Sequence, residues 1–309
     1  GHEVGHAGGT EQVPVVAFDG GLVAHHQCGQ HPGTARIAHA LGDAVADGLA
    51  QPVDRVQQGD KADPVRPGQR LEAYQRIDKL LEQSEKSDLI ILPEMFHTGF
   101  SMNTELADEW NENKALHVLK NWSSKHHSAI YTSMMVHEDK HFFNRGVFVE
   151  PSGKVSIYDK RKSFGLGGED EVFTEGTKET IVSYNGWKIN MQICYDLRFP
   201  ELIRNRIEEN GQAAYDVLLY VANWPKKRVL HWSTLLQARA IENQCYTVGV
   251  NRVGIDGNEI VYPGASAVYN GLGATLLEMD NQEAVRKCTL SWTEIQELRI
   301  QLPFLKDRK

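Results

Sequence analysis

The most informative stretch of the sequence reads Gln192-Ile193-Cys194-Tyr195-Asp196-Leu197-Arg198-Phe199-Pro200-Glu201-Leu202. Ahead of it, apolar and polar residues alternate from Trp187 to Ile193, which is the period-two pattern of a half-buried strand. Behind it, residues 200–206 are typical of the start of a helix. The pattern therefore predicts Cys194 on a turn from strand to helix, where the amides that follow it can point at a developing anion. An unpaired cysteine is more often a small core residue, so its partners decide whether Cys194 is a nucleophile.

The length and composition of the chain indicate one large domain with an extension. Its 309 residues, of which 41% are hydrophobic, can bury a sizeable core. We predict an atypical N-terminal extension of unknown role over residues 1–66 and the main domain over residues 67–309. The extension is rich in histidine, glycine and alanine. Its His25-His26 pair and Cys28 lack a second pair of ligands at a suitable spacing, so no metal site is predicted.

Charge and cysteine usage narrow the class of protein. A formal net charge of -8 argues against nucleic acid as a partner, because phosphate binding requires a basic surface. No apolar run approaches the roughly 18 residues needed to span a bilayer, and the N-terminus lacks the pattern of a secretion signal. The 4 cysteines are widely spaced, which fits a reducing compartment. We therefore expect a cytoplasmic protein that binds a small molecule and has neither nucleic acid nor a membrane as a partner.

From residue 71 onward, helical and strand patterns alternate, as in layered α/β proteins. Apolar residues at helical spacing predict helices at 71–81, 107–125 and 229–243. Short apolar or alternating runs predict strands at 89–92, 129–135, 144–150, 154–159, 180–184, 187–194, 216–221, 246–251 and 265–269. Upstream, residues 13–18 also look like a strand. The mixture predicts an α/β fold in which helices cover the faces of the sheets.

Glu94 comes just after the predicted strand at 89–92, in the sequence Leu92-Pro93-Glu94. In open α/β folds the carboxyl ends of the strands form the ligand crevice, so a carboxylate there is held rigidly and can be reached by substrate. Apolar residues flank it on both sides, which argues against a solvated surface residue. Glu94 is therefore a candidate general base.

Two further residues can act together with Glu94. Lys160 follows a predicted strand within the run Lys160-Arg161-Lys162, and spacing alone does not choose among the three; Glu169 lies in a glycine-bearing loop. A thiol is a weak nucleophile near its ordinary pKa of about 8.5, so it needs a base or a cation beside it. A glutamate can take its proton, and a lysine can stabilise a tetrahedral oxyanion. A pair of cysteine and histidine is the alternative, with His97 as the nearest challenger.

Three blocks of the sequence resemble the signature blocks of the nitrilase superfamily, the carbon-nitrogen hydrolases: Leu92-Pro93-Glu94, Tyr158-Asp159-Lys160 and Ile193-Cys194-Tyr195-Asp196-Leu197-Arg198-Phe199. They occur in the right order and at suitable separations. The resemblance implies that Cys194 is the nucleophile, Glu94 the general base and Lys160 the oxyanion-stabilising cation. It also implies that the amide of Tyr195 completes the oxyanion hole. Glu169 matches the family's second glutamate, which would position Lys160 and help handle the leaving ammonia.

The resemblance further implies a fold, an assembly and the absence of a cofactor. Proteins of this superfamily are layered α-β-β-α sandwiches that associate through one helical face into homodimers. They hydrolyse their substrates through a cysteine thioester without a cofactor. We therefore expect a four-layer sandwich, a homodimer and no cofactor for this chain.

Other stretches resemble the omega-amidase-like branch of the superfamily, at residues 95–102, 222–232, 238–244 and 302–307. Members of that branch hydrolyse the terminal amide of 2-oxoglutaramate and 2-oxosuccinamate, and the resemblance covers residues 70–308. Asn223, Trp224 and Pro225 follow the strand at 216–221 and are expected to line the pocket. Phe100 can close over the substrate, although ordinary packing explains it equally well.

Two features depart from the family pattern. After Lys160 the family usually has histidine-leucine-phenylalanine, whereas this chain reads Arg161-Lys162-Ser163-Phe164. The family also begins with a hydrophobic strand that ends in glutamine, and residues 50–66 have no such character. The strand at 13–18 lies far upstream unless the intervening segment loops out. Because a missing central strand would expose the backbone groups of its neighbours, we expect some segment to fill this position.

The sequence leaves other functions open. The same residues would serve a different amide hydrolase, an N-carbamoyl hydrolase or a nitrilase. A catalytically silent ligand-binding member of the family is the alternative outside the enzymes. The presence of Glu94, Lys160, Glu169 and Cys194 argues against it.

Overall fold

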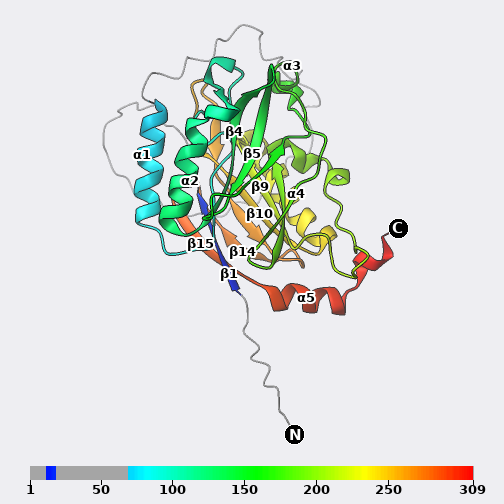
Figure 1. The fold of residues 1–309 in the computed structure, drawn as a ribbon. Coiled ribbons are helices and arrows are strands. Elements are labelled where there is room, and N and C mark those ends of the chain that lie inside the picture. Colours follow the sequence, from blue (N-terminus) through cyan, green and yellow to red (C-terminus); the bar gives the residue numbers. More distant parts are fainter. Residues whose placement is uncertain (1–11, 19–68, 309) are drawn as a thin grey trace, which may run out of the picture.

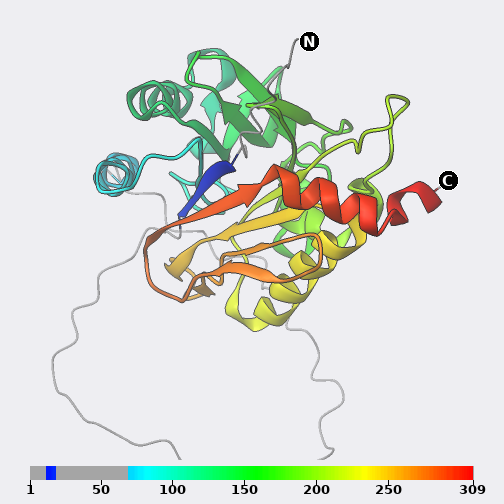
Figure 2. The ribbon, with the colours of Figure 1, turned by 90° about the horizontal axis from the view of Figure 1, so that it is seen from below.

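The computed structural model describes residues 69–308 and the backbone of residues 12–18. These parts of the chain form two large sheets. Helices α1 (Gln69–Glu82) and α2 (Lys114–His126) lie beside the first sheet, and α4 (Val229–Asn243) lies beside the second (Figure 1). Seen from below, the two groups of helices are on opposite sides of the paired sheets (Figure 2). This is the α-β-β-α layering that the sequence predicts.

The first sheet has the strand order β15-β1-β2-β4-β5-β6, and β3 pairs with the end of β4. Its strands are β1 (Gln12–Phe18), β2 (Leu89–Ile91), β3 (Asp108–Glu109), β4 (Ala129–Glu138), β5 (His141–Val149), β6 (Val155–Asp159) and β15 (Val285–Ser291). β2 runs parallel to β4, and β5 joins β4 to β6 by antiparallel pairing. β2 and β6 therefore end at the same edge of the sheet.

The second sheet has the strand order β14-β13-β10-β9-β8-β7. Its strands are β7 (Ile181–Tyr184), β8 (Trp187–Ile193), β9 (Val217–Ala222), β10 (Tyr246–Asn251), β13 (Ala267–Tyr269) and β14 (Thr275–Glu278), and β11 (Val253–Ile255) pairs separately with β12 (Val261–Pro263). β8, β9 and β10 are mutually parallel. Their carboxyl ends therefore lie together, as a ligand site in such a sheet requires.

The helices are α1 (Gln69–Glu82), α2 (Lys114–His126), the short α3 (Glu169–Val172), α4 (Val229–Asn243) and α5 (Trp292–Gln301). Successive side chains of a strand point to opposite faces of its sheet, so the core is divided into a cluster between the sheets and outer clusters on their far faces. Ile91 of β2 and Leu219 of β9 belong to the cluster between the sheets. Their neighbours Ile90 and Leu218 face the outer layers, where Leu218 packs with Trp232 of α4. Within the described residues, no helix has the length and apolar character needed to cross a membrane.

Strand β1 fills the position that the sequence leaves open. Its backbone pairs antiparallel with β15, with Val15 opposite Cys288, and parallel with β2, with Val15 opposite Leu89. The upstream segment at 12–18 thus supplies a strand of the first sheet, although it precedes residue 67. Residues 1–11 and 19–68, including residues 25–28 and 50–66 discussed above, lie outside the described residues. The predicted extension as a whole therefore stays a prediction.

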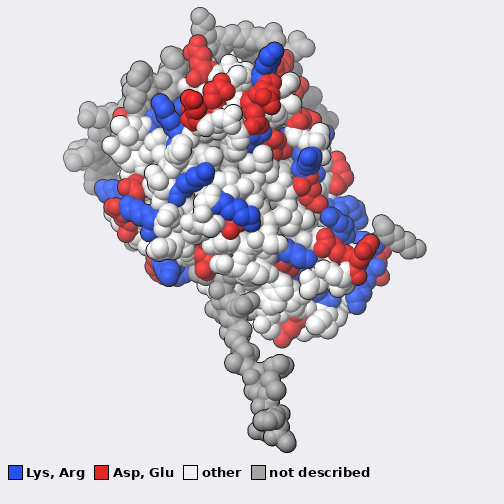
Figure 3. Space-filling view, viewed as in Figure 1, with Lys and Arg blue, Asp and Glu red and all other residues white. Residues whose placement is uncertain are grey.

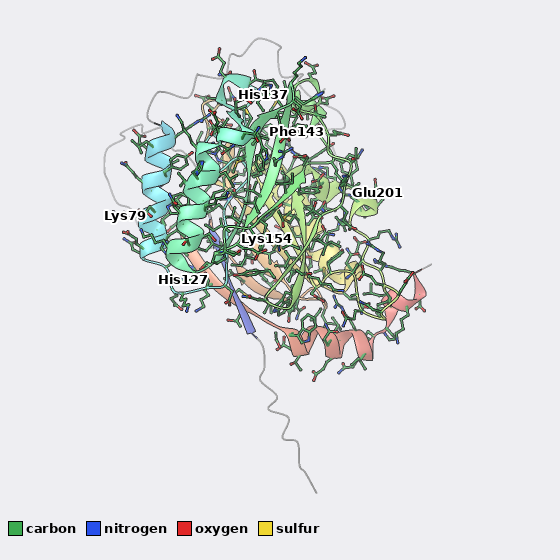
Figure 4. The ribbon with its side chains drawn as sticks, in the orientation of Figure 1. Lys79, His127, His137, Phe143, Lys154 and Glu201 are labelled. Atoms are coloured by element: carbon green, nitrogen blue, oxygen red, sulfur yellow. The ribbon has the colours of Figure 1, made fainter. Side chains whose placement is uncertain are left out.

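The helix predicted from residue 200 is wrong. The structure has two short 3-10 turns instead, η4 (Cys194–Arg198) and η5 (Pro200–Leu202), and Glu201 of η5 lies at the surface (Figure 4). The side chain of Asn205 accounts for the difference, because it donates hydrogen bonds of 2.9 Å to the carbonyls of Tyr215 and Asn243. These contacts hold the backbone away from a helical path.

The helix predicted at 107–125 begins later than expected. Asn113 caps α2, since its side-chain oxygen accepts a 2.7 Å hydrogen bond from the backbone amide of Leu116. The preceding residues form β3 and the 3-10 turns η1 (Thr104–Leu106) and η2 (Trp110–Glu112). The sequence patterns also miss β14, β15 and α5. These elements expose many of their residues, so they carry a weaker hydrophobic signal.

Candidate active site

Cys194 follows directly on β8 and begins the turn η4. Its backbone φ is 43°, in the left-handed region that residues with a side chain seldom adopt. Cys194 is only half-buried, whereas Gln192 and Ile193 before it are fully buried. A reactive side chain is held clear of its neighbours by a turn of this kind at the carboxyl end of a parallel strand.

Glu94 lies beyond the end of β2 and is 1% exposed. Its Oε1 accepts hydrogen bonds from Lys160 Nζ at 3.1 Å and from Asn144 Nδ2 at 2.8 Å. Its Oε2 accepts a 2.8 Å bond from the backbone amide of Asn223, which follows β9 in the other sheet. The carboxylate of Glu94 therefore ties the two sheets together at the edge where Cys194 lies.

Lys160 follows β6 and is buried among carboxylates. Its Nζ lies 2.9 and 2.8 Å from the two carboxylate oxygens of Glu169, besides its bond to Glu94. Burial by itself would lower the pKa of Lys160, but the negative charges of Glu169 and Glu94 outweigh it and raise the pKa above its ordinary value. Lys160 is therefore an ammonium at neutral pH.

The structure also distinguishes Lys160 from the two basic residues that follow it. The guanidinium of Arg161 donates to Tyr158 Oη at 3.2 Å and to the carbonyl of Leu202 at 2.8 Å. Lys162 is half-exposed, and its Nζ lies 3.9 Å from Glu175. Only the first residue of the basic run reaches the Glu94 carboxylate.

Asn144, on β5, is a site residue that the sequence reasoning missed. Its side-chain amide donates both to Glu94 Oε1 at 2.8 Å and to Glu169 Oε1 at 3.1 Å, so one group bridges two carboxylates. Glu169 is fully buried and accepts a further 2.7 Å bond from the backbone amide of Phe164. The available signal was a buried polar residue within the otherwise largely apolar strand β5, next to Phe143 (Figure 4).

The environment of the thiol favours its protonated form in the free protein. Burial raises the pKa of Cys194 well above its ordinary value, and the charge of Glu94 raises it further. Lys160 acts in the opposite direction, as does a hydrogen bond from the Asn223 backbone. Because the thiol keeps its proton, a nucleophilic role for this sulfur would require a base that takes the proton.

The residues predicted to line the pocket lie in different surroundings. Asn223 is buried, and its side-chain amide donates to the Glu94 carbonyl at 2.9 Å. Trp224 is also buried, with its Nε1 donating to the Arg228 carbonyl at 2.7 Å and the Arg198 guanidinium 4.7 Å from its ring centre. Pro225 is half-buried beside them. These contacts place Asn223 against Glu94, the candidate base, and leave the role of all three toward substrate a prediction.

Two aromatic residues border the buried charges. Phe100 packs with its ring centre 5.6 Å from Lys160 Nζ. Tyr195 follows the cysteine, and its ring packs edge-on against Phe164 and Phe199 at centroid distances of 5.1 and 5.2 Å. Phe100 and Tyr195 are both half-buried, whereas Glu94, Lys160 and Glu169 are buried.

His97 does not join the site. It is fully buried, and its ring stacks on Tyr74 at 5.9 Å and packs against Phe96 at 4.7 Å. Neither ring nitrogen has a hydrogen-bond partner among the described residues. Burial lowers the pKa of His97 to about 3, so the ring is neutral. It is a core residue, and Glu94 remains the candidate base.

The model of one protein family, carbon-nitrogen hydrolase, matches residues 56–300. The chain belongs to this family. Curated relatives agree: an omega-amidase YafV from Yersinia enterocolitica is 40% identical over 232 residues, which cover 75% of this chain and 88% of that protein. A 2-oxoglutaramate amidase from Paenarthrobacter nicotinovorans is 34% identical over 259 residues, covering 76% and 82%. This carbon-nitrogen hydrolase is thus an enzyme acting on amides, of the omega-amidase-like branch.

A solved structure resembles the chain along nearly its whole length. XC1258 from Xanthomonas campestris, a carbon-nitrogen hydrolase superfamily protein with an arsenic adduct in its active site, is 32% identical. It superposes with a TM-score of 0.79 over 97% of this chain and 98% of its own. The fold class predicted from the sequence is confirmed.

Asn144 provides a test of the charge cluster in this carbon-nitrogen hydrolase. Asn144→Leu removes the donor shared by Glu94 and Glu169, and bonds to charged groups contribute about 1.5–3 kcal/mol each. We expect kcat to fall by at least about tenfold with little change in KM. Asn205→Leu, which alters a buried asparagine that donates to the carbonyls of Tyr215 and Asn243, is the control and should lower the melting temperature without this loss. Steady-state kinetics measure both; equal kcat values in the two variants would contradict the assigned role of Asn144.

Proposed function

We propose that this enzyme hydrolyses the terminal amide of a small 2-oxo acid amide, of the 2-oxoglutaramate or 2-oxosuccinamate type, and releases ammonia through a thioester on Cys194. The relatives named omega-amidase and 2-oxoglutaramate amidase support this substrate class. The observation that carries the reaction type is the buried cluster in which Lys160 Nζ lies 3.1 Å from Glu94 and 2.8 Å from Glu169.

The cluster can carry out each step of amide hydrolysis. Glu94 takes the proton of Cys194 while the sulfur attacks the amide carbon. The ammonium of Lys160 and the backbone amide of Tyr195 stabilise the oxyanion, and ammonia leaves with a proton returned by Glu94. Water, activated by the same carboxylate, then cleaves the thioester and frees the thiol. Glu169 holds Lys160 in place throughout, and no step uses a cofactor or a metal.

Arginine side chains beside the nucleophile support a substrate that carries a carboxylate. The guanidinium of Arg198 lies over Trp224, and that of Arg228 lies 5.3 Å from the ring centre of Phe164. Burial lowers the pKa of Arg198, and the charge of Arg228 lowers it further, while Cys194 acts in the opposite direction. No carboxylate of the described residues forms an ion pair with either arginine, so both can bind an anion.

An exposed apolar face supports a proposal for the oligomeric state of the enzyme. Large apolar side chains are exposed on α4, where Leu230 is 74% and Ile241 50% exposed, and Leu272 is 63% exposed in the turn before β14. The turn packs closely against two helices. A Cβ atom added at Gly273 would clash with Ile241 of α4, and one added at Gly271 would clash with Leu298 of α5. We propose that this face forms a homodimer of a cytoplasmic enzyme.

Neither nucleic acid nor a membrane is proposed as a partner. On the face shown in Figure 3, Lys and Arg side chains are interspersed with Asp and Glu, and acidic side chains gather at the top of the view. Such a surface does not favour phosphate backbones. The small amide is therefore the proposed ligand.

The proposed reaction is tested by incubating the protein with 2-oxoglutaramate and measuring ammonia. We expect release by the wild type and none by Cys194→Ala, because the alanine lacks the attacking sulfur. Release of carbon dioxide together with ammonia from an N-carbamoyl substrate, or turnover of a nitrile, would indicate another carbon-nitrogen hydrolase. A folded wild type that turns over none of these compounds would indicate a ligand-binding member.

Substitution of Arg198 tests whether this arginine binds a carboxylate of the substrate. Arg198→Met should raise KM for 2-oxoglutaramate by about tenfold or more, since a charge-assisted bond contributes about 1.5–3 kcal/mol. KM for an uncharged amide of similar size should change little. Arg206→Met, at an exposed arginine paired with Glu179, is the matched control and should leave both values unchanged. Equal effects of Arg198→Met on charged and uncharged amides would argue against the anion contact.

A charged substitution on this apolar face tests whether it forms the homodimer contact. Leu230→Glu should shift the sedimentation coefficient from that of a dimer to that of a monomer, because a charge would be buried in the contact. Leu166→Glu changes another exposed leucine, 53% exposed and in the loop before α3, and should leave the dimer intact. A wild type that sediments as a monomer would contradict this part of the proposal.

A further inference from the structure

Asp196 is a fully buried carboxylate beside the nucleophile that the mechanism above does not use. Its Oδ2 accepts hydrogen bonds from the backbone amide of Ile193 at 3.0 Å and from Tyr158 Oη at 2.8 Å. Its Oδ1 accepts a 2.9 Å bond from the backbone amide of Lys162. Three donors from two distant segments of the chain therefore converge on one side chain.

The three donors lie next to the two charged or reactive groups of the site. Tyr158 and Lys162 stand two residues before and two residues after Lys160. Ile193 immediately precedes Cys194. The carboxylate of Asp196 thus connects the segment that carries the ammonium to the turn that carries the sulfur. No other described side chain accepts hydrogen bonds from both segments.

The conformation of Cys194 requires such a connection. A non-glycine residue at a φ of 43° is disfavoured, and it persists only where the surroundings fix it. Asp196 fixes the turn at both ends. Its side chain binds the amide before the cysteine, and its carbonyl accepts a 3.0 Å bond from the amide of Phe199.

Arg161 extends the connection. Its Nε donates to Tyr158 Oη at 3.2 Å, and Tyr158 in turn donates to Asp196, so the bonds point in one direction toward the carboxylate. Arg161 also binds the carbonyl of Leu202 at 2.8 Å, beyond the nucleophile turn. Burial raises the pKa of Asp196 to about 6, and Lys160 acts against this rise, so the group is ionised at neutral pH. An ionised carboxylate can accept all three bonds.

We propose that Asp196 is a positioning residue, whose carboxylate sets the placement of the Cys194 sulfur relative to the Lys160 ammonium as the oxyanion forms. The proposal rests on the proposed amidase function, because it concerns the same transition state. Asp196 is fully buried, so the proposal gives it no direct contact with substrate. It acts through the backbone on either side of Lys160 and in front of Cys194.

Asp196→Asn in the full chain tests this role. The amide keeps the size of the side chain but presents N–H groups to at least one of the three donors. We expect kcat for ammonia release from 2-oxoglutaramate to fall about 100-fold, as for loss of an oxyanion donor, with KM changed by less than about threefold. The rate of alkylation of Cys194 by iodoacetamide, followed by peptide mass mapping, should fall about tenfold because the ammonium no longer favours the thiolate.

Asp216→Asn is the matched control. Asp216 is a buried aspartate at the opposite end of β9, and its oxygens accept bonds from the Lys188 amide at 3.0 Å and from Arg299 at 2.6 Å. This variant should lose thermal stability but keep the wild-type kcat and alkylation rate. A folded Asp196→Asn with kcat and alkylation within twofold of the wild type would overturn the proposal. Equal losses in the two variants would do so as well.

Tyr158→Phe keeps the test decisive if Asp196→Asn does not fold. It removes one of the three donors and leaves the ring in the core, and we expect kcat to fall about threefold to tenfold at constant KM. An unchanged kcat and alkylation rate would then overturn the proposal.

The alkylation assay is independent of substrate. A wild type with a reactive Cys194 but no ammonia release would show that the proposed substrate is wrong, while alkylation would still decide the role of Asp196.

Discussion

A buried ammonium shared by two carboxylates is the constraint on which the rest of this structure depends. Lys160 lies between Glu94 and Glu169, and an unpaired charge of either kind in this place would cost several kcal/mol. The cluster has one more negative than positive charge, which the amides of Asn144 and Asn223 help to stabilise. In the proposed reaction, Glu94 takes the thiol proton and the excess charge passes to the sulfur beside the same ammonium. The reaction therefore moves charge within an environment already arranged for it.

The sandwich fold is what brings these charges together. Glu94 and Lys160 follow strands of the first sheet, whereas Cys194 and Asn223 follow strands of the second, so the site exists only while the sheets keep their relative placement. Tyrosine hydroxyls cross between the sheets just below the site: Tyr131 donates to the Gln192 carbonyl at 2.8 Å and Tyr158 donates to Asp196. The packed core between the sheets fixes the register, since a slip by one residue would reverse the faces of a strand.

Sequence reasoning could reach the candidate residues Glu94, Lys160 and Cys194 because each follows a strand with a clear hydrophobic pattern and falls within a family motif. It could not reach Asn144, whose role depends on a neighbour 50 residues away in the chain. The helix predicted from residue 200 failed because Asn205 bonds to Tyr215 and Asn243, contacts that no local pattern encodes. The position of β1 was equally hidden, since pairing of residues 12–18 with β2 bridges a long intervening segment. Local patterns thus predict elements and their ends, while side-chain contacts between distant segments must be seen in three dimensions.

The proposed reaction requires that the substrate acylates the sulfur of Cys194. Rapid acid quench of the enzyme during turnover of 2-oxoglutaramate, followed by intact-protein mass spectrometry and peptide mapping, measures this directly. We expect a transient mass increase equal to a 2-oxoglutaryl group less one hydrogen, located on the peptide that contains Cys194. Turnover with no acylated protein at any quench time, or with the acyl group on another residue, would contradict it.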